Sequence, residues 1–330
     1  VFLVDSATSL SIILGQLIMR AGEVLLEVVR NEMVESVHPG HLLILGSDGE
    51  EVLKIGDIDQ LIYPRSAVKS LQASAMLRAG LKVNGPQLAL ACASHAGSAA
   101  HLEVALSTLA SVGLNESALR NTPDKPLGAA ERAAWGDKAP TSLAANCSGK
   151  HSAMVATCAT NGWDLATYKL PEHPLQIAIR KEFESVSGEK ITKVGVDGCG
   201  AALFAISLRA LARAIRNLTL SSESIHQEVV SACRNNPVMV SGIGRLPTVL
   251  MEKVPGLFVK DGAEGVMIMS LPQGQTIVWK MSDGSQRGAS SLAIASLSHL
   301  GINVDLEREK VMGDGQVVGE IRASKLVLHG

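Results

Sequence analysis

Short apolar runs with strand-like composition lie near both ends of the chain. Toward the N-terminal end, runs rich in leucine or β-branched residues occupy 23–30, 41–45 and 51–55. An Asp-Gly pair, Asp48-Gly49, separates the second run from the third. Because Asp-Gly between apolar runs is a strong signal for a tight turn, the pattern predicts an antiparallel meander with its turn at this pair.

The middle of the chain carries apolar positions at helical spacing. Glycine adopts the left-handed conformation that ends many helices, and Gly80, Gly113 and Gly162 suit this role. Serines near the start of the run at 222–234 are available to cap a helix there. The prolines and mixed charges of 115–139 predict the longest loop. The expected helices cover 68–78, 98–112, 149–160, 201–217 and 222–234.

The C-terminal part returns to a strand-like pattern around the turn residues Pro272-Gln273-Gly274. A helix is expected before Gly301, which again suits a helix stop. The expected elements are strands at 256–260, 265–270 and 276–281, a helix near 290–300 and a last strand at 317–328.

Strands at both ends with helices between them predict an α/β fold of the α+β type. One sheet would join the N- and C-terminal strands, helices would flank it, and a helical lobe would be added. Strands and helices do not alternate regularly, so a doubly wound parallel sheet is not expected. We expect a single domain over 22–330 and an N-terminal extension of unclear role over 1–21. The extension lacks a basic n-region and an uninterrupted apolar run, so it predicts neither a signal peptide nor a membrane span.

Composition narrows the classes of partner. The formal charge of -2 gives no basic face for nucleic acid, and aromatic residues at 3% provide few stacking platforms. Small polar substrates fit this composition better. Five cysteines, an odd number, do not favour a disulfide scaffold, and reduced thiols or metal ligands fit a cytoplasmic protein.

A serine and a lysine three residues apart form the first candidate chemistry. Pro64 disfavours helical geometry at the residue before it, so Ser66 is expected near a helix start, with Lys69 on the same face one turn later. A serine needs a base, and burial beside a helix N-terminus favours the neutral lysine that can act as one. The same spacing is typical of a capping serine followed by a solvated lysine, so it does not establish a site by itself.

Two cysteines flanked by glycines, Cys147 and Cys199, are each expected at a helix start. That position lowers a thiol pKa, and two thiolates with a third donor predict a site for zinc or another soft metal. Lys150 and His151 follow Cys147 on one face. The alternative is two small buried residues in tight turns. The remaining cysteines lie in apolar contexts and are expected in the core: Cys92, Cys158 and Cys233.

Five ordered motifs together resemble the asparaginase II family, the rhizobial-type or class 3 L-asparaginases. The resemblance extends over nearly the whole chain, from about residue 22 to residue 328. That family is similar in fold to serine β-lactamases and glutaminases, with a sheet of terminal strands, flanking helices and a helical lobe. The motifs are Val34-Glu35-Ser36-Val37-His38, Tyr63-Pro64-Arg65-Ser66-Ala67-Val68-Lys69, Asn146-Cys147-Ser148-Gly149-Lys150-His151, Asp197-Gly198-Cys199-Gly200 and Lys260-Asp261-Gly262-Ala263-Glu264-Gly265.

The resemblance implies hydrolysis of L-asparagine to L-aspartate and ammonia by a homodimer. It implies two serine–lysine tandems that face each other, and a site for one zinc ion with water. By themselves, the residues would favour His151 over a lysine as the third zinc ligand, because a lysine must be neutral to bind a metal. The tandems are Ser66 with Lys69 and Ser94 with Lys260, and the metal ligands are Cys147, Lys150 and Cys199.

An asparagine substrate needs a cation for its α-carboxylate, and Arg65 offers bidentate geometry beside the nucleophile. Asp197 is the candidate for the α-ammonium group. By analogy with the fold family, the backbone amides of Ser66 and Ala263 would donate to the oxyanion. His151 is expected to contact the substrate or to tune the metal site. Zinc is expected to hold the two cysteine turns and to orient Asp197 and His151, rather than to activate the attacking water.

The sequence also allows three alternatives. Ser94 is an alternative nucleophile, with Ser66 as the relay. A related serine amide hydrolase, either a glutaminase or a β-lactam-recognising protein, is the alternative enzyme. A non-catalytic, zinc-stabilised amino-acid sensor is the alternative without chemistry. His95 and His101 are expected to be structural rather than ligands.

Overall fold

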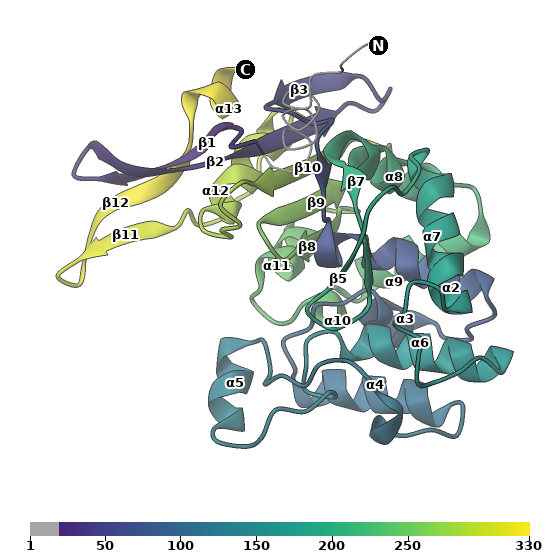
Figure 1. The fold of residues 1–330 in the computed structure, drawn as a ribbon. Helices are drawn as coiled ribbons and strands as arrows, with labels where there is room; N and C mark the ends of the chain where they lie inside the picture. Colours follow the sequence, from purple (N-terminus) through teal and green to yellow (C-terminus); the bar gives the residue numbers. More distant parts are fainter. Residues whose placement is uncertain (1–19) are drawn as a thin grey trace, which may run out of the picture.

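The computed structural model describes residues 20–330, and nearly all of the expected N-terminal extension lies outside them. Strands from both ends of the described chain form one antiparallel sheet of eight strands (Figure 1). Its order is β11-β12-β1-β2-β10-β9-β8, and β3 pairs with β2 beside this path. The strands are β1 (Glu23–Arg30), β2 (Met33–Leu45), β3 (Glu51–Ile55), β8 (Phe258–Gly262), β9 (Val266–Ser270), β10 (Thr276–Met281), β11 (Lys310–Gly313) and β12 (Gln316–Ala323).

The pairing of β2 with β10 joins the two ends of the chain. Leu43 lies opposite Val278 in this register, and both are fully buried. Every residue of β10 is buried, including the polar Thr276 and Lys280, so the strand is covered on both faces. The structure therefore confirms the predicted fold class, a mixed α/β fold with a sheet of terminal strands.

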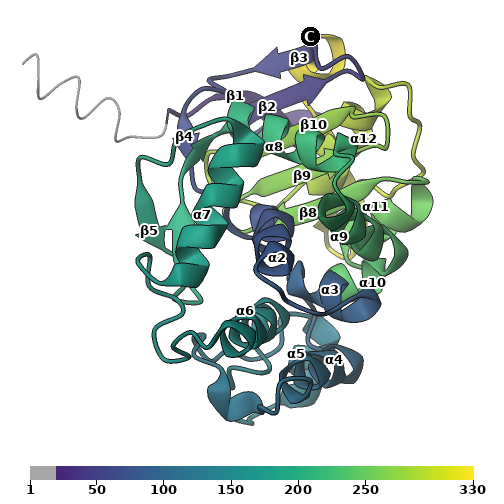
Figure 2. The same cartoon turned by 90° about the vertical axis from the view of Figure 1, so that its right-hand side faces the viewer.

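Helices cover the sheet and build a separate lobe. Helix α8 packs against β2, β9 and β10, while α12 packs against β1 and β12. Helices α3, α4 and α6 pack together below the sheet, with α5 beside them (Figure 1). Helix α2 lies between this lobe and the sheet (Figure 2). The helices are α2 (Lys69–Arg78), α3 (Gly85–Ala91), α4 (Ala99–Ala110), α5 (Ala129–Trp135), α6 (Ser148–Asn161), α7 (Pro174–Ser187), α8 (Leu208–Leu220), α9 (Ser224–Asn235), α10 (Pro237–Val240), α11 (Leu246–Lys253), α12 (Ala289–Ser298) and α13 (Lys325–His329).

The helix predicted at 201–217 is wrong before Leu208. Strand β6 (Ala202–Phe204) pairs with β5 (Val194–Val196), and β7 (Ile206–Ser207) pairs with β4 (Leu61–Ile62). Strand pairing here overrides the helix propensity of the alanines. The helix starts only where the Ser207 hydroxyl accepts a hydrogen bond from the Ala210 amide, at 3.0 Å.

Three smaller expectations also change. The last strand ends at Ala323, and α13 replaces the rest of the strand predicted over 317–328. The loop predicted at 115–139 contains α5 and a short 3-10 turn, η2 (Glu116–Ala118). The serines expected to cap α9 do not do so, because its N-cap residue is Glu223 and no side chain caps it. Among residues 20–330, no helix has the length and apolar character needed to cross a bilayer.

Candidate active site

Ser66 lies in a short 3-10 turn, η1 (Arg65–Val68), directly before α2. The Ala67 amide donates to the Pro64 carbonyl at 3.1 Å, which closes the turn. Arg65 adopts a left-handed conformation with a φ of 52°, which is unusual for a residue with a side chain. The turn delivers Ser66 just ahead of the helix, as the sequence predicted, and Lys69 becomes the first residue of α2.

Lys69 is 1% exposed and points toward a different serine. Its Nζ donates to the Ser94 hydroxyl at 3.2 Å and to the Ala93 carbonyl, and within the described chain it makes no hydrogen bond to Ser66. Burial, followed by the nearby charges of Lys150 and Lys260, lowers the pKa of Lys69 to about 7. Near neutral pH, a large share of Lys69 is therefore in the neutral form that can accept a proton.

The Ser94 hydroxyl lies between the ends of two lysines. Lys260, in the middle of β8, donates to it from Nζ at 3.0 Å. The same Nζ also donates to the Asp261 carbonyl and is ion-paired with the Asp261 carboxylate. Burial lowers the pKa of Lys260, and the charge of Asp261 opposes this shift. Of the two expected tandems, Ser94 with Lys260 is hydrogen-bonded. Lys69 also donates to Ser94, and not to its expected partner Ser66.

A cavity of about 330 Å³ lies beside this cluster and is lined by many of the predicted site residues. Lys69, Ser94 and Lys260 are not among its lining residues, and each is almost fully buried. Ser66 is thus the candidate serine that a small molecule in this cavity would meet. The lining residues are Arg65, Ser66, Thr122, Pro123, Asp124, Ala145, Asn146, Cys147, Asp197, Gly198, Cys199 and Ala263.

The close approach of β8 to the Ser66 turn depends on a glycine. A Cβ atom on Gly262 would lie 2.6 Å from the Pro64 carbonyl oxygen and 3.1 Å from the Ala67 amide nitrogen. Both are backbone atoms, so neither can move aside as a flexible side chain would. This contact explains why Lys260 in β8 and Ala263, the residue directly after the strand, reach the same site as Ser66.

Arg65 and Asp197, predicted to bind opposite ends of the substrate, form an ion pair with each other. Arg65 Nε donates to Asp197 Oδ1 at 2.8 Å, and both side chains are mostly buried. A more distant partner, Glu264, lies 3.9 Å from another guanidinium nitrogen. The two opposite charges therefore stand side by side at the wall of the cavity.

The two cysteine motifs converge, but only one begins a helix. Cys147 is the N-cap residue of α6, as expected. Cys199 instead lies in the turn of the β5–β6 hairpin, so the expectation of a helix start there is wrong. The hairpin pairs Val196 with Ala202 and leaves 197–201 as the connection.

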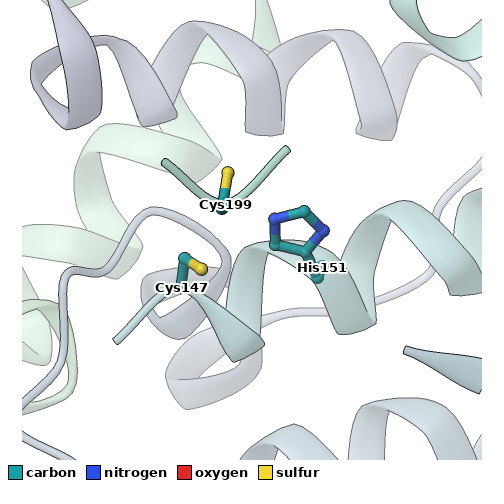
Figure 3. Close-up of side chains that lie close together, drawn as sticks. All are labelled: Cys147, His151 and Cys199. Carbon is teal, nitrogen blue, oxygen red and sulfur yellow. The ribbon is translucent and has the colours of Figure 1, made fainter. Parts of the chain in front are cut away.

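Cys147, His151 and Cys199 form a buried group that could bind a metal ion (Figure 3). One potential ligand atom from each lies within 4.8 Å of the others. Lys150 is next to them, with Nζ donating to Cys199 Sγ at 3.2 Å. The hydrogen bond from the Cys147 thiol, and then the charge of Lys150, hold the pKa of Cys199 far below its usual range. A thiolate, a thiol and an imidazole in one buried site fit the ligand preferences of zinc.

The orientation of His151 also fits a metal site. Its Nδ1 lies 2.7 Å from the Tyr168 hydroxyl, and Nε2 is buried with no hydrogen-bond partner in the described structure. Burial, and then the charge of Lys150, lowers the pKa of His151 to about 4. The neutral ring with one free nitrogen is the form that ligates metals, and a partner on the other nitrogen is the usual support.

Several residues of the site carry no recognisable signal in the sequence. Thr122, Pro123 and Asp124 line the cavity from the segment interpreted only as a loop. Tyr168, one of only two tyrosines in the chain, belongs to none of the motifs. His95 and His101 stack on each other with ring centroids 5.1 Å apart, which agrees with their expected structural role.

A buried cluster of serine and lysine beside a small polar cavity is the kind of site found in hydrolases that use an activated serine. The sequence profile of the L-asparaginase II family matches residues 26–323. The chain therefore belongs to the L-asparaginase II family, whose members are asparaginase-type amidohydrolases.

Two solved structures are similar to the chain at low identity. Mglu in its native form is 12% identical, and the match covers 88% of this chain and 69% of Mglu, with a TM-score of 0.41. A β-lactamase from Mycobacterium bovis is 14% identical, and the match covers 74% of this chain and 88% of the β-lactamase, with a TM-score of 0.37. No curated protein matches the sequence significantly.

Proposed function

We propose that the protein hydrolyses L-asparagine to L-aspartate and ammonia. Membership of the L-asparaginase II family supports this proposal. The structural observation that carries it is the cavity of about 330 Å³ whose wall contains Ser66, Arg65 and Asp197 together. A free amino acid with a side-chain amide needs these three groups: a nucleophile, a cation and a carboxylate.

The substrate would lie across the Arg65–Asp197 pair. Its α-carboxylate would accept hydrogen bonds from the guanidinium nitrogens that Asp197 does not use, and its α-ammonium group would donate to the second carboxylate oxygen of Asp197. A zwitterion can approach this pair without leaving either charge unpaired. The backbone amides of Ser66 and Ala263 would donate to the oxyanion that forms at the side-chain carbonyl.

Ser66 is the proposed nucleophile because it lines the cavity and Ser94 does not. Lys69, in its neutral form, would accept the Ser66 proton as the serine oxygen bonds to the amide carbon. The carbon–nitrogen bond then breaks, and the nitrogen takes a proton and leaves as ammonia. Water hydrolyses the resulting ester by the reverse proton route, which releases aspartate and restores Ser66.

Ser94 and Lys260 would support this proton movement. The Ser94 hydroxyl receives hydrogen bonds from both lysines, so it connects Lys69 to Lys260. The ion pair with Asp261 favours the ammonium form of Lys260. A cation at this position stabilises negative charge near the reacting serine and can return a proton through Ser94.

Zinc is the proposed ion for the cysteine site. Cys147 and Cys199 would hold it, with Lys150 or His151 as a further ligand. When bound, zinc would supply a fixed positive charge and a rigid link between α6 and the β5–β6 turn, which carries Asp197. We further propose a single domain over 22–330 and a homodimer, which follow from the resemblance to the family. A cytoplasmic location is also proposed, because reduced thiols or metal ligands fit the odd number of cysteines.

Ammonia release tests the proposal and its alternatives together. We expect turnover of L-asparagine above that of L-glutamine or a chromogenic β-lactam, and its loss in Ser66→Ala and Lys69→Met. Lys82→Met is a matched control because Lys82 is exposed and makes no contact with the site. Preference for glutamine or the β-lactam would favour the related hydrolases. Calorimetric binding of L-asparagine without ammonia release would favour the sensor.

A further inference from the structure

A second group of hydrogen-bonded side chains lies outside the candidate active site, where α7 meets the connection between α8 and α9. The Ser221 hydroxyl lies 2.8 Å from His226 Nδ1, and His226 Nε2 lies 2.7 Å from Glu182 Oε1. Glu182 and His226 are both about 5% exposed, whereas Ser221 is only half-buried. The three residues thus form a line from a buried carboxylate to an accessible hydroxyl.

The proton positions follow from the buried end of this line. Burial opposes ionisation of Glu182, but hydrogen bonds from His226 and Arg78 lower its pKa overall. An ionised carboxylate only accepts hydrogen bonds. Nε2–H of His226 is therefore the donor to Glu182, and in the neutral ring the lone pair of Nδ1 faces Ser221. The Ser221 hydroxyl then donates to this nitrogen.

This order of serine, histidine and carboxylate is the arrangement that activates a serine nucleophile. Arg78 donates from Nε to the second oxygen of Glu182 at 3.1 Å and holds the carboxylate in place. It also donates to Glu223 at 2.8 Å. The base and its orienting carboxylate are therefore fixed by contacts from three helices, α2, α7 and α9.

Space for a small substrate lies next to the serine. Ser221 and His226 line a cavity of about 460 Å³, together with Arg78, Asn217 and Ser222. Helix α9 begins three residues after Ser221, and no side chain caps the amides of its first turn. Such amides are free donors that suit a developing oxyanion.

We propose that Ser221, His226 and Glu182 form a second acyl-transfer site, which acts on small uncharged carboxylic esters. Ser221 Oγ bonds to the ester carbonyl carbon while its proton passes to His226 Nδ1. The bond from that carbon to the alkoxy oxygen breaks, and the alkoxy group takes the proton from His226 and leaves as an alcohol. Water then cleaves the acyl-serine by the same route, which gives a carboxylic acid and the free serine.

The test uses the full chain and two probes, p-nitrophenyl acetate and a fluorophosphonate that labels activated serines. A Ser66→Ala, Ser94→Ala background removes the serines of the other site. In this background, we expect the fluorophosphonate on the Ser221 peptide. We also expect Ser221→Ala to reduce ester hydrolysis by about 100-fold, the usual contribution of a positioned nucleophile and base.

Ser222→Ala is the matched control, because Ser222 is the adjacent residue, lines the same cavity and makes no hydrogen bond to His226. It should change labelling and hydrolysis by less than about twofold. Peptide mapping of the wild-type chain separates a label on Ser221 from one on Ser66 or Ser94, so the outcome does not depend on how well the background variant folds. An unlabelled Ser221, equal labelling of Ser221 and Ser222, or unchanged hydrolysis in Ser221→Ala would each overturn the proposal.

Discussion

Lys69 and Ser94 are 25 residues apart in the sequence, yet Lys69 Nζ donates to the Ser94 hydroxyl at 3.2 Å. Lys260 donates to the same hydroxyl at 3.0 Å. The two lysines differ in their other partners, because Lys260 is ion-paired with Asp261 and Lys69 meets no carboxylate in the described structure. This asymmetry favours a neutral Lys69 and a charged Lys260.

Activity should rise with pH through the titration of Lys69. Its pKa is lowered to about 7, first by burial and then by the charges of Lys150 and Lys260. A base must be neutral to accept a proton, so kcat/KM should fall by about tenfold for each pH unit below 7 and level off above it. Lys69→Arg stays charged at every pH and should be inactive throughout. A flat profile between pH 5 and 8 would show that Lys69 is not the base.

Removing the charge of Asp261 should weaken the ion pair that holds Lys260 in its ammonium form, with little effect on substrate binding. In Asp261→Asn, the ammonium form of Lys260 loses its ion pair, so kcat should fall by about 10- to 100-fold with little change in KM. Asp305→Asn is the control, because Asp305 pairs with Lys253 at the surface. Equal kinetics in the two variants would mean that the Asp261 contact does not support catalysis.

Arg65 should contribute mainly to substrate binding. Arg65→Lys keeps the charge but loses the planar, bidentate geometry, so we expect KM for L-asparagine to rise by about 10- to 100-fold. Asp197→Asn should weaken binding similarly. If the two residues hold opposite ends of one substrate while pairing with each other, the double variant should lose less than the sum of the two. Strict additivity would contradict this arrangement.

Zinc binding at the cysteine site should depend on both cysteine ligands. Elemental analysis of purified protein should find about one zinc ion per chain, and Cys147→Ser or Cys199→Ser should remove it. Cys158→Ala is the control, since Cys158 lies on the same helix α6 but in the hydrophobic core. Comparison of Lys150→Met with His151→Gln identifies the third ligand. Zinc retained in both cysteine variants would show that these cysteines do not bind it.

Gly262→Ala should disturb the site through the backbone. The added methyl group would press on the Pro64 carbonyl and the Ala67 amide, at a cost of about 1–3 kcal/mol in the free energy of unfolding and with loss of activity. Gly46→Ala meets chiefly the flexible side chain of Asp48 and serves as the control. Denaturant unfolding and ammonia release measure the two effects. Wild-type behaviour in Gly262→Ala would mean that the close approach of β8 is unnecessary.

The sequence predicted the elements best where local signals were strong. The turn at Asp48-Gly49 and the helix stops at Gly80 and Gly162 lie where they were expected, because each depends on residues close in the chain. The helix predicted over 201–207 failed because those residues pair with β4 and β5, and that pairing leaves no local signal in an alanine-rich segment.

In the candidate site, too, the sequence predicted the local features but not the contacts between distant residues. The Ser-x-x-Lys motif correctly placed Ser66 and Lys69 at a helix start, but their spacing could not show that Lys69 turns toward Ser94. The choice between Lys150 and His151 also depended on side-chain directions that the sequence does not encode locally. Both lie next to Cys199. Lys150 donates a hydrogen bond to it at 3.2 Å, and His151 belongs with it to the group that could bind a metal.

The central claim is that Ser66 attacks the side-chain amide of L-asparagine. Rapid acid quenching during turnover, followed by peptide mass spectrometry, reports directly which serine carries the acyl group. We predict one aspartyl group on the peptide that contains Ser66, and none on the peptide that contains Ser94. An aspartyl group on Ser94, with Ser66 unmodified, would contradict the account.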